Sequence, residues 1–250
     1  TTLAFAGEIE LDSLDGVPVV YQHFFYQAEQ SVTYHIKRIM NGYMPPLAAD
    51  PDNLINAAEA DERIQISGDQ RKAIRAALTN KITIITGGPG TGKTTIINLI
   101  VKIFKQMGIS VALAAPTGRA AKRITETSGM EAMTIHRLLE YVYSEDENEM
   151  EFGRNAENPL EEDSFIVDEA SMIDLMLMDG FLNALEDDSR LIIVGDADQL
   201  PSVGAGNVLL DMINSDYVPT IRLEEIFRQA SESRIVVNAH SINSGEYPES

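Results

Sequence analysis

A glycine-rich segment between a buried strand and a helix restricts the fold of this chain more than any other feature. The segment GGPGTGKT at residues 87–94 matches the pattern G-x-x-x-x-G-K-[ST]. It follows the apolar run KITIITG at 81–87, which predicts a strand, and it opens a helix predicted over about 93–107. Glycines let backbone N–H groups curl around a phosphate chain, and a helix N-terminus favours anions. The segment therefore predicts a nucleotide phosphate site.

The residues of this segment have separate expected roles. Lys93 is expected to reach the β- and γ-phosphates, and the Thr94 hydroxyl is expected to be a ligand of Mg²⁺. The magnesium ion is implied by the motif rather than visible in it. The residues expected to surround the phosphates are Gly88, Pro89, Gly90, Thr91, Gly92, Lys93, Thr94 and Thr95.

Two acidic residues follow a second apolar run. In FIVDEAS at 165–171, Asp168 and Glu169 come at the end of a predicted strand, where open parallel sheets bind ligands. We expect Asp168 to hold Mg²⁺ through water and Glu169 to orient, or take a proton from, the attacking water. Together with the glycine-rich segment, this pair predicts hydrolysis of a nucleoside triphosphate, without indicating what work the hydrolysis drives.

Strands and helices alternate from residue 67 onward. Strands are predicted at 81–87, 110–116, 164–170, 190–196 and 220–225, and helices at about 69–78, 93–107, 118–127 and 174–185. Continuous apolar strands between helices predict an α/β domain whose mainly parallel sheet is covered by helices on both faces.

The region before residue 67 has a different pattern. Residues 3–11 and 17–21 predict short strands, and apolar spacing predicts a helix over about 24–40. The proline- and aspartate-rich segment 42–53 breaks this pattern. We therefore assign 1–41 to the end of a small α+β N-terminal domain, 42–66 to a linker with a short helix near 53–60, and 67–250 to the nucleotide-binding domain.

Composition excludes several classes of protein. The 250 residues contain no cysteine, which excludes disulfides and cysteine-ligated zinc or iron–sulfur centres. No apolar run reaches the ~18–20 residues of a membrane span, and residues 1–10 lack the basic start and long apolar stretch of a signal peptide. The chain is therefore expected to be soluble and cytoplasmic, without a membrane partner.

The charge of the chain is unevenly distributed. The net charge of −20 argues against nucleic acid, yet ten basic residues and no acidic one lie between Asp69 and Glu126. Residues 144–163 instead carry nine acidic residues and one arginine. The local field around 70–125 is therefore positive, and a nucleic-acid contact stays open.

Four further stretches indicate how the hydrolysis is used. Gln70 precedes the phosphate motif, APTGRAAKR at 115–123 follows the second strand, and MTIHRLL at 133–139 places His136 at a helix start. A lone histidine is more often structural. VGDADQLPSVGAGN at 194–207 puts Gln199 just after the fourth strand, where it could sense the γ-phosphate or the attacking water.

This ordered set of motifs resembles the RecD-like helicases of superfamily 1, related to the exodeoxyribonuclease V alpha subunit. The resemblance runs from about residue 67 to the C-terminus through QRKAI, GGPGTGKTT, APTGRAAKR, TIHRLL, VDEAS, GDADQLPSVGAGNVL and LEEIFRQ. It implies a RecA-like P-loop NTPase domain that is the first of two motor lobes. The second lobe, which would complete the ATP and DNA sites, is expected to lie outside this chain.

The resemblance also implies roles for individual residues. Gln70 corresponds to an adenine-recognising glutamine, and Gln199 to a glutamine that couples the γ-phosphate to DNA. Arg228 corresponds to an arginine that contacts the γ-phosphate, where a cation would stabilise transition-state charge. The residues that correspond to contacts with single-stranded DNA are Thr117, Gly118, Arg119 and His136.

The resemblance implies ATP, Mg²⁺ and single-stranded DNA as cofactors and partner, with 5′→3′ translocation in DNA recombination or repair. Other nuclease or helicase subunits stay open as partners. For this piece alone we expect weak nucleotide binding and little or no unwinding.

Three alternatives stay open at this point. The chain could be a DNA-independent P-loop ATPase that remodels a protein partner, or a non-catalytic module with a vestigial phosphate loop. The acidic stretch 144–163 is best interpreted as a solvated surface loop, and the alternative is that it repels DNA from one face of the lobe.

Overall fold

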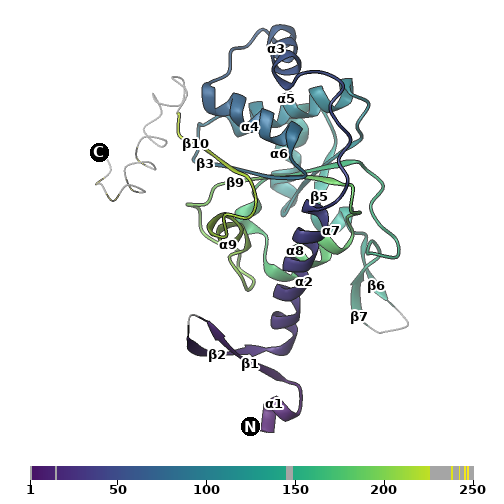
Figure 1. Ribbon diagram of the computed structural model, residues 1–250, viewed down its shortest axis with the longest axis vertical. Helices are drawn as coiled ribbons and strands as arrows, with labels where there is room; N and C mark the ends of the chain where they lie inside the picture. Colours follow the sequence, from purple (N-terminus) through teal and green to yellow (C-terminus); the bar gives the residue numbers. More distant parts are fainter. Residues whose placement is uncertain are drawn as a thin grey trace.

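A parallel sheet forms the centre of the molecule (Figure 1). The computed structural model describes residues 2–14, 16–144 and 149–225, together with Asn238, Ile242, Gly245 and Tyr247. Within these ranges, six strands lie in the order β10-β3-β9-β8-β4-β5, and every neighbouring pair is parallel. The strands are β3 (Ile82–Gly87), β4 (Val111–Ala115), β5 (Ala132–Thr134), β8 (Ser164–Val167), β9 (Arg190–Gly195) and β10 (Thr220–Leu223). The predicted α/β fold is confirmed.

Helices cover both faces of this sheet (Figure 1). One face carries α3 (Pro51–Glu62), α4 (Gly68–Thr79), α5 (Lys93–Gln106) and α6 (Gly118–Ser128). The opposite face carries α2 (His23–Met40), α7 (Ile135–Leu138), α8 (Leu175–Asn183) and α9 (Val208–Asn214).

The strands are apolar on both faces because each face has its own core. Side chains alternate across a strand, so Ile84 packs into the cluster with α2, α8 and α9, while Ile85 packs with α4, α5 and α6. Phe165 and Ile166 divide in the same way on β8. Continuous apolar runs are therefore required here, which is why they predicted a parallel sheet.

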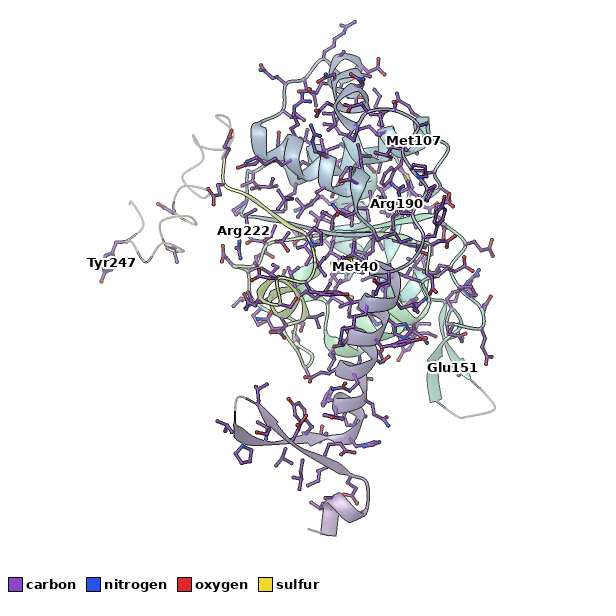
Figure 2. The ribbon with its side chains drawn as sticks, viewed as in Figure 1. Met40, Met107, Glu151, Arg190, Arg222 and Tyr247 are labelled. Atoms are coloured by element: carbon purple, nitrogen blue, oxygen red, sulfur yellow. The ribbon has the colours of Figure 1, made fainter. Side chains whose placement is uncertain are left out.

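Buried polar contacts hold the edge of the sheet at which the strands begin. Arg190, at the start of β9 (Figure 2), is buried, donates to the carbonyl of Leu78 at 3.2 Å and lies over the ring of Phe104. Burial lowers the pKa of this arginine. Lys81 donates to the carbonyl of Tyr43 at 3.0 Å, and its burial lowers its pKa to about 8.

The N-terminal region is a hairpin followed by a long helix. Strands β1 (Ile9–Leu14) and β2 (Val17–Gln22) pair antiparallel, and the helix α1 (Thr2–Phe5) precedes them. The strand expected over residues 3–11 is therefore wrong in its first half. Gly7, which has φ 73°, lies between the helical turn and β1 and allows the chain to change direction there.

Helix α2 runs from this hairpin to the sheet, and Met40 lies at its end (Figure 2). Its apolar residues Val32, Ile36 and Ile39 belong to the core cluster that contains α8. Arg38 fixes the same contact, because its guanidinium donates to Asp187 at 2.5 Å and to two carbonyls at the end of α8. The division of the chain at residues 41 and 66 stays a prediction.

Several elements differ from the sequence-based expectation. Helix α3 is longer than the expected 53–60 because Pro51 occupies its first turn and Asp50 caps it. Strand β8 ends at Val167 rather than at the predicted residue 170, where the 3₁₀ helix η1 (Ala170–Met172) begins. Strands β6 (Tyr141–Ser144) and β7 (Glu149–Phe152) pair antiparallel, so a strand lies near the start of the acidic stretch 144–163 where a loop was expected. No described helix is long and apolar enough to cross a membrane.

A close backbone contact joins the end of α2 to the loop after α8, and it gives the first prediction. A Cβ on Gly42 would overlap the carbonyl oxygen of Asp187, which is backbone and cannot turn aside. Gly42→Ala should therefore lower the free energy of unfolding by about 1–3 kcal/mol, measured by urea denaturation. Gly68→Ala is the matched control, because a Cβ there meets nothing within 4 Å. Equal stability of the two variants would contradict this contact.

Candidate nucleotide-binding site

The phosphate loop joins β3 to α5 at the carboxyl edge of the sheet. Gly90 and Gly92 both have φ 82°, a conformation that L side chains rarely adopt, and Gly92 is the N-cap of α5. Gly87 has no room for a side chain, because a Cβ there would lie 2.8 Å from both Leu223 and Thr91. The Thr91 hydroxyl donates to the carbonyl of Gly88 at 2.9 Å, which closes the loop on itself.

Lys93 begins helix α5 and folds back over this loop. Its ammonium group donates to the carbonyls of Gly87 and Gly88. Burial lowers the pKa of Lys93, while the carboxylates of Asp196, Asp168 and Glu169 act in the opposite direction. The lysine is therefore a poorly solvated cation that three carboxylates surround at longer range.

Gln70 lies beside the phosphate loop, and both ends of its amide have protein partners. It is 1% exposed, its Nε2 donates to the carbonyl of Thr91 at 3.1 Å, and its Oε1 accepts from the N–H of Ser67. Ser67 in turn caps α4 by accepting from the N–H of Gln70, which completes a capping box. Gln70 therefore fixes the start of α4 against the phosphate loop. Its role in adenine recognition stays a prediction.

The acidic pair Asp168 and Glu169 follows β8, the strand that lies between β9 and β4 in the sheet. Asp168 is 3% exposed, and burial raises the pKa of its carboxyl group. Its Oδ1 atom is buried without a hydrogen-bond partner among the described residues. Glu169 has φ 56°, an uncommon backbone conformation for a residue other than glycine or asparagine. Backbone strain of this kind is concentrated at functional sites.

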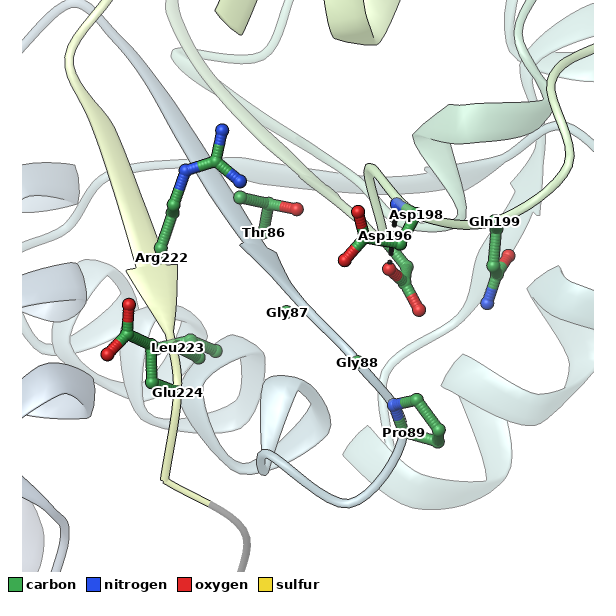
Figure 3. Close-up of a pocket in the computed structure, with 10 residues that line it drawn as sticks. All are labelled: Thr86, Gly87, Gly88, Pro89, Asp196, Asp198, Gln199, Arg222, Leu223 and Glu224. Carbon is green, nitrogen blue, oxygen red and sulfur yellow. Dashed lines mark hydrogen bonds between the residues drawn. The ribbon is translucent and has the colours of Figure 1, made fainter. Parts of the chain in front are cut away.

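Two adjoining pockets are lined by the phosphate loop, Lys93, Gln70 and Glu169, whereas Asp168 lines neither of them. The larger, of about 920 Å³, lies between the phosphate loop and the residues Gln65, Gln70, Arg123 and Glu169. The smaller, of about 460 Å³, lies on the other side of the loop, between the segment after β9 and strand β10 (Figure 3). Gln199 lines both pockets.

The segment after β9 is tied to strand β3 and to the 3₁₀ helix η1 that follows β8. The N–H of Ala197 donates to Thr86 of β3 at 3.0 Å, and the Ser171 hydroxyl donates to Gln199 Oε1 at 3.3 Å. Figure 3 shows Asp196, Asp198 and Gln199 facing the loop residues Gly87 to Pro89 across the pocket. Asp196 is 5% exposed, so a buried carboxylate lies in this segment, and the sequence alone assigns it no role.

The residues expected to contact DNA lie along the same edge of the sheet. Thr117 caps α6 by accepting from the N–H of Ala120, and Gly118 and Arg119 are exposed in the first turn of that helix. His136 is exposed on α7, with its ring 5.3 Å from the ring of Tyr141. Strands β4 and β5 pair with Ala115 opposite Thr134, so these two groups follow neighbouring strands. Their contact with DNA stays a prediction.

One predicted site residue lies outside the residues that the structure describes, and one residue of the pocket was not predicted from the sequence. Arg228 falls outside the described residues. Arg123, which the sequence analysis treated only as part of a basic segment, lines the larger pocket and lies 3.1 Å from Glu169 and 3.8 Å from Asp168. The available signal was its spacing of four residues from Arg119, which places both on one face of a helix.

Several known proteins are similar to this chain. The AAA domain family matches residues 70–205. The ATP-dependent RecD2 DNA helicase of Deinococcus radiodurans is 34% identical over 229 residues, which cover 92% of this chain and 30% of that protein. The RecBCD enzyme subunit RecD of Mycolicibacterium smegmatis is 38% identical over 168 residues, covering 58% of this chain and 30% of the subunit. The subunit RecD of Haemophilus influenzae is 33% identical and covers 77% of this chain and 34% of its own length.

A solved structure agrees in fold. The Pif1 helicase from Candida albicans superposes with a TM-score of 0.54 over 74% of this chain and 46% of its own, at 23% sequence identity. The chain spans about 30% of the length of the RecD2 helicase and of the mycobacterial RecD subunit.

The bonds of Gln70 give a prediction about stability without nucleotide. Gln70→Ala removes the donor to the Thr91 carbonyl and half of the capping box, so the free energy of unfolding should fall by about 1–3 kcal/mol. Chemical denaturation of the nucleotide-free protein measures this loss. Gln65→Ala, at an exposed glutamine five residues earlier, should leave stability within about 0.5 kcal/mol. A Gln70 variant as stable as this control would show that the bonds contribute nothing.

The buried carboxyl of Asp168 gives a prediction about pH. Because its pKa is raised in the folded state, the protein loses stability as pH rises through that pKa. Asp168→Asn should therefore raise the free energy of unfolding at pH 7 by about 0.5–2 kcal/mol. The gain should shrink as pH falls toward the ordinary carboxyl range. Urea titrations at several pH values test this, with the exposed Asp198→Asn as control, and a gain independent of pH contradicts it.

Proposed function

This chain belongs to the RecD-like superfamily 1 helicases of the AAA domain family, and we propose that it is the first motor lobe of an ATP-dependent DNA helicase. The observation that carries the proposal is the convergence of Lys93, Asp168 and Glu169 at the carboxyl edge of one parallel sheet. A pocket of about 920 Å³ opens there, beside the N-terminus of α5. A pocket of this size next to a helix N-terminus suits a nucleoside triphosphate. Of the curated relatives named above, one is described as an ATP-dependent DNA helicase and two as subunits of the RecBCD enzyme.

The proposed ligand of the larger pocket is ATP. Its phosphates would lie on the backbone of residues 88–95, with Lys93 turning from the carbonyls of Gly87 and Gly88 toward the β- and γ-phosphates. The base would lie toward Ile64, Gln65 and Gln70, which line the opposite part of the pocket. Recognition of adenine by Gln70 would then require its amide to exchange a present partner for the base.

The residues around Asp168 fit a magnesium ion. The buried Oδ1 atom of Asp168 lacks a partner in the described protein, and Thr94 lines the larger pocket together with Glu169, the residue after Asp168. In the described part of the chain no three acidic or histidine side chains form a metal cage. Magnesium in nucleotide sites is bound by one or two carboxylates together with substrate phosphates. When bound, the ion would neutralise charge on the phosphates during transfer.

Glu169 is proposed to hold the attacking water. The water oxygen would bond to the γ-phosphorus as the bond to the bridging oxygen of ADP breaks, and the water proton would pass to Glu169. Lys93 would stabilise the charge that develops on the γ-phosphate. Gln199 lines both pockets and receives a hydrogen bond from Ser171, so it is placed to respond to the γ-phosphate, and Arg228 is proposed as a further cation.

Single-stranded DNA is proposed to run over the starts of α6 and α7. Thr117, Gly118, Arg119 and His136 follow two neighbouring strands at the edge that also holds the nucleotide site. Hydroxyl groups, free N–H groups and arginine at such positions suit a sugar–phosphate backbone. A second RecA-like lobe, 5′→3′ translocation, a role in recombination or repair, and association with nuclease or helicase subunits are proposed on family resemblance.

The proposal is tested by ATP hydrolysis of the full-length parent protein with and without single-stranded DNA. DNA should stimulate hydrolysis, and Lys93→Ala should lower kcat by about 100-fold or more, because it removes the cation nearest the γ-phosphate. Lys105→Ala, at the far end of the same helix, should leave the rate unchanged. Hydrolysis that is indifferent to DNA would instead support an ATPase that remodels a protein partner.

A further inference from the structure

An ion pair connects the proposed catalytic glutamate to helix α6. Arg123 Nη2 lies 3.1 Å from Glu169 Oε1 and 3.8 Å from Asp168 Oδ2. In the described part of the chain, Arg123 is the only cation within ion-pair distance of Glu169. A carboxylate held in this way is oriented toward a guanidinium group, and one of its oxygens is occupied by that group.

The ion pair is built so that it can open. The Arg123 side chain is 57% exposed, whereas that of Glu169 is 17% exposed, so the cation lies at the rim above a largely covered carboxylate. Exposed ion pairs contribute little net free energy, because water and salt compete with them. An anion that binds near the exposed Arg123 side chain can therefore draw it away from Glu169 at a small cost in free energy.

Helix α6 links this ion pair to the proposed DNA contacts. Arg119 and Arg123 are four residues apart, so they lie on the same face of the helix, one turn from each other. Thr127, one turn further along, also lines the nucleotide pocket. The first turn of α6 holds Thr117, Gly118 and Arg119, which the proposed function assigns to DNA. One helical face therefore runs from the proposed DNA contact to the hydrolytic carboxylate.

We propose that Arg123 is a positioning residue that restrains Glu169 until a DNA backbone reaches the first turn of α6. A phosphate bound beside Arg119 would attract the Arg123 guanidinium, which has the length and exposure to turn toward it. Glu169 would then be free to orient the attacking water. This inference rests on the proposed function, and it adds the physical connection between DNA binding and hydrolysis.

A different role is possible for the same residue in chemical terms, and the test distinguishes the two. Arg123 lines the nucleotide pocket, so it could bind the terminal phosphate of ATP directly. Removal of a phosphate-binding cation slows hydrolysis with and without DNA and raises KM for ATP. Removal of a restraint on Glu169 speeds only the reaction without DNA.

The experiment compares Arg123→Gln, Arg123→Lys and Lys105→Gln in the full-length protein, at saturating ATP with and without saturating single-stranded DNA. Arg123→Gln should raise kcat without DNA about two- to fivefold and leave kcat with DNA unchanged, so that the stimulation ratio falls by the same factor. KM for ATP should not change. Arg123→Lys keeps the charge and should restore most of the low basal rate. Lys105→Gln removes an exposed charge at the end of α5 and should behave like the wild type.

Four results would overturn the inference. Equal loss of kcat with and without DNA would make Arg123 a phosphate-binding cation, and an unchanged stimulation ratio would make the ion pair incidental. A wild-type protein without any DNA stimulation would overturn both the inference and the proposed function. A stimulated wild type, with Lys93→Ala inactive and Arg123→Gln unaltered, would overturn only the role of Arg123. Thermal unfolding of each variant checks that the fold is intact.

Discussion

The need to bury both faces of a parallel sheet determines where the chemistry of this chain lies. Parallel strands require crossover helices, and the helices here cover both faces, so loops that carry function are left at the strand ends. The phosphate loop follows β3, Asp168 and Glu169 follow β8, and Gln199 follows β9. Because β3, β9 and β8 are consecutive in the sheet, these three loops are neighbours at one carboxyl edge. The site is thus a direct consequence of strand order.

The same site concentrates charges that the fold alone would not favour. Burial raises the pKa of Asp168 and lowers that of Lys93, and Glu169 takes a left-handed backbone conformation. Each of these features costs free energy in the absence of a ligand. Lys93 satisfies its donors on loop carbonyls, while Arg123 partly balances the two carboxylates from the rim. A nucleotide with its metal ion supplies complementary charges, so the strain is consistent with a site prepared for such a ligand.

The core on the face of the sheet covered by α2, α7, α8 and α9 includes a helix, α2, that precedes the nucleotide-binding motifs in sequence. Helix α2 places Ile36 and Ile39 in the core beneath β3 and β9, and Arg38 and Gly42 hold its end against the loop after α8. The N-terminal piece is therefore part of the packing of the central domain at its helical end. Its hairpin extends away from the sheet (Figure 1), with Leu11, Leu14, Val17 and Val20 exposed.

The sequence by itself determined the features that short windows encode. The spacing of the glycines predicted the phosphate loop, and apolar runs predicted β3, β4 and β9. The apolar run before Asp168 and Glu169 placed this pair at a strand end. Backbone freedom and burial act locally, so short segments of sequence record them. Only the tertiary structure decided the strand order, the short edge strand β5, the pairing of β6 with β7 and the contact of Arg123 with Glu169. These depend on residues far apart in the chain, and their free energy comes from packing and charge pairing in space, which no local pattern records.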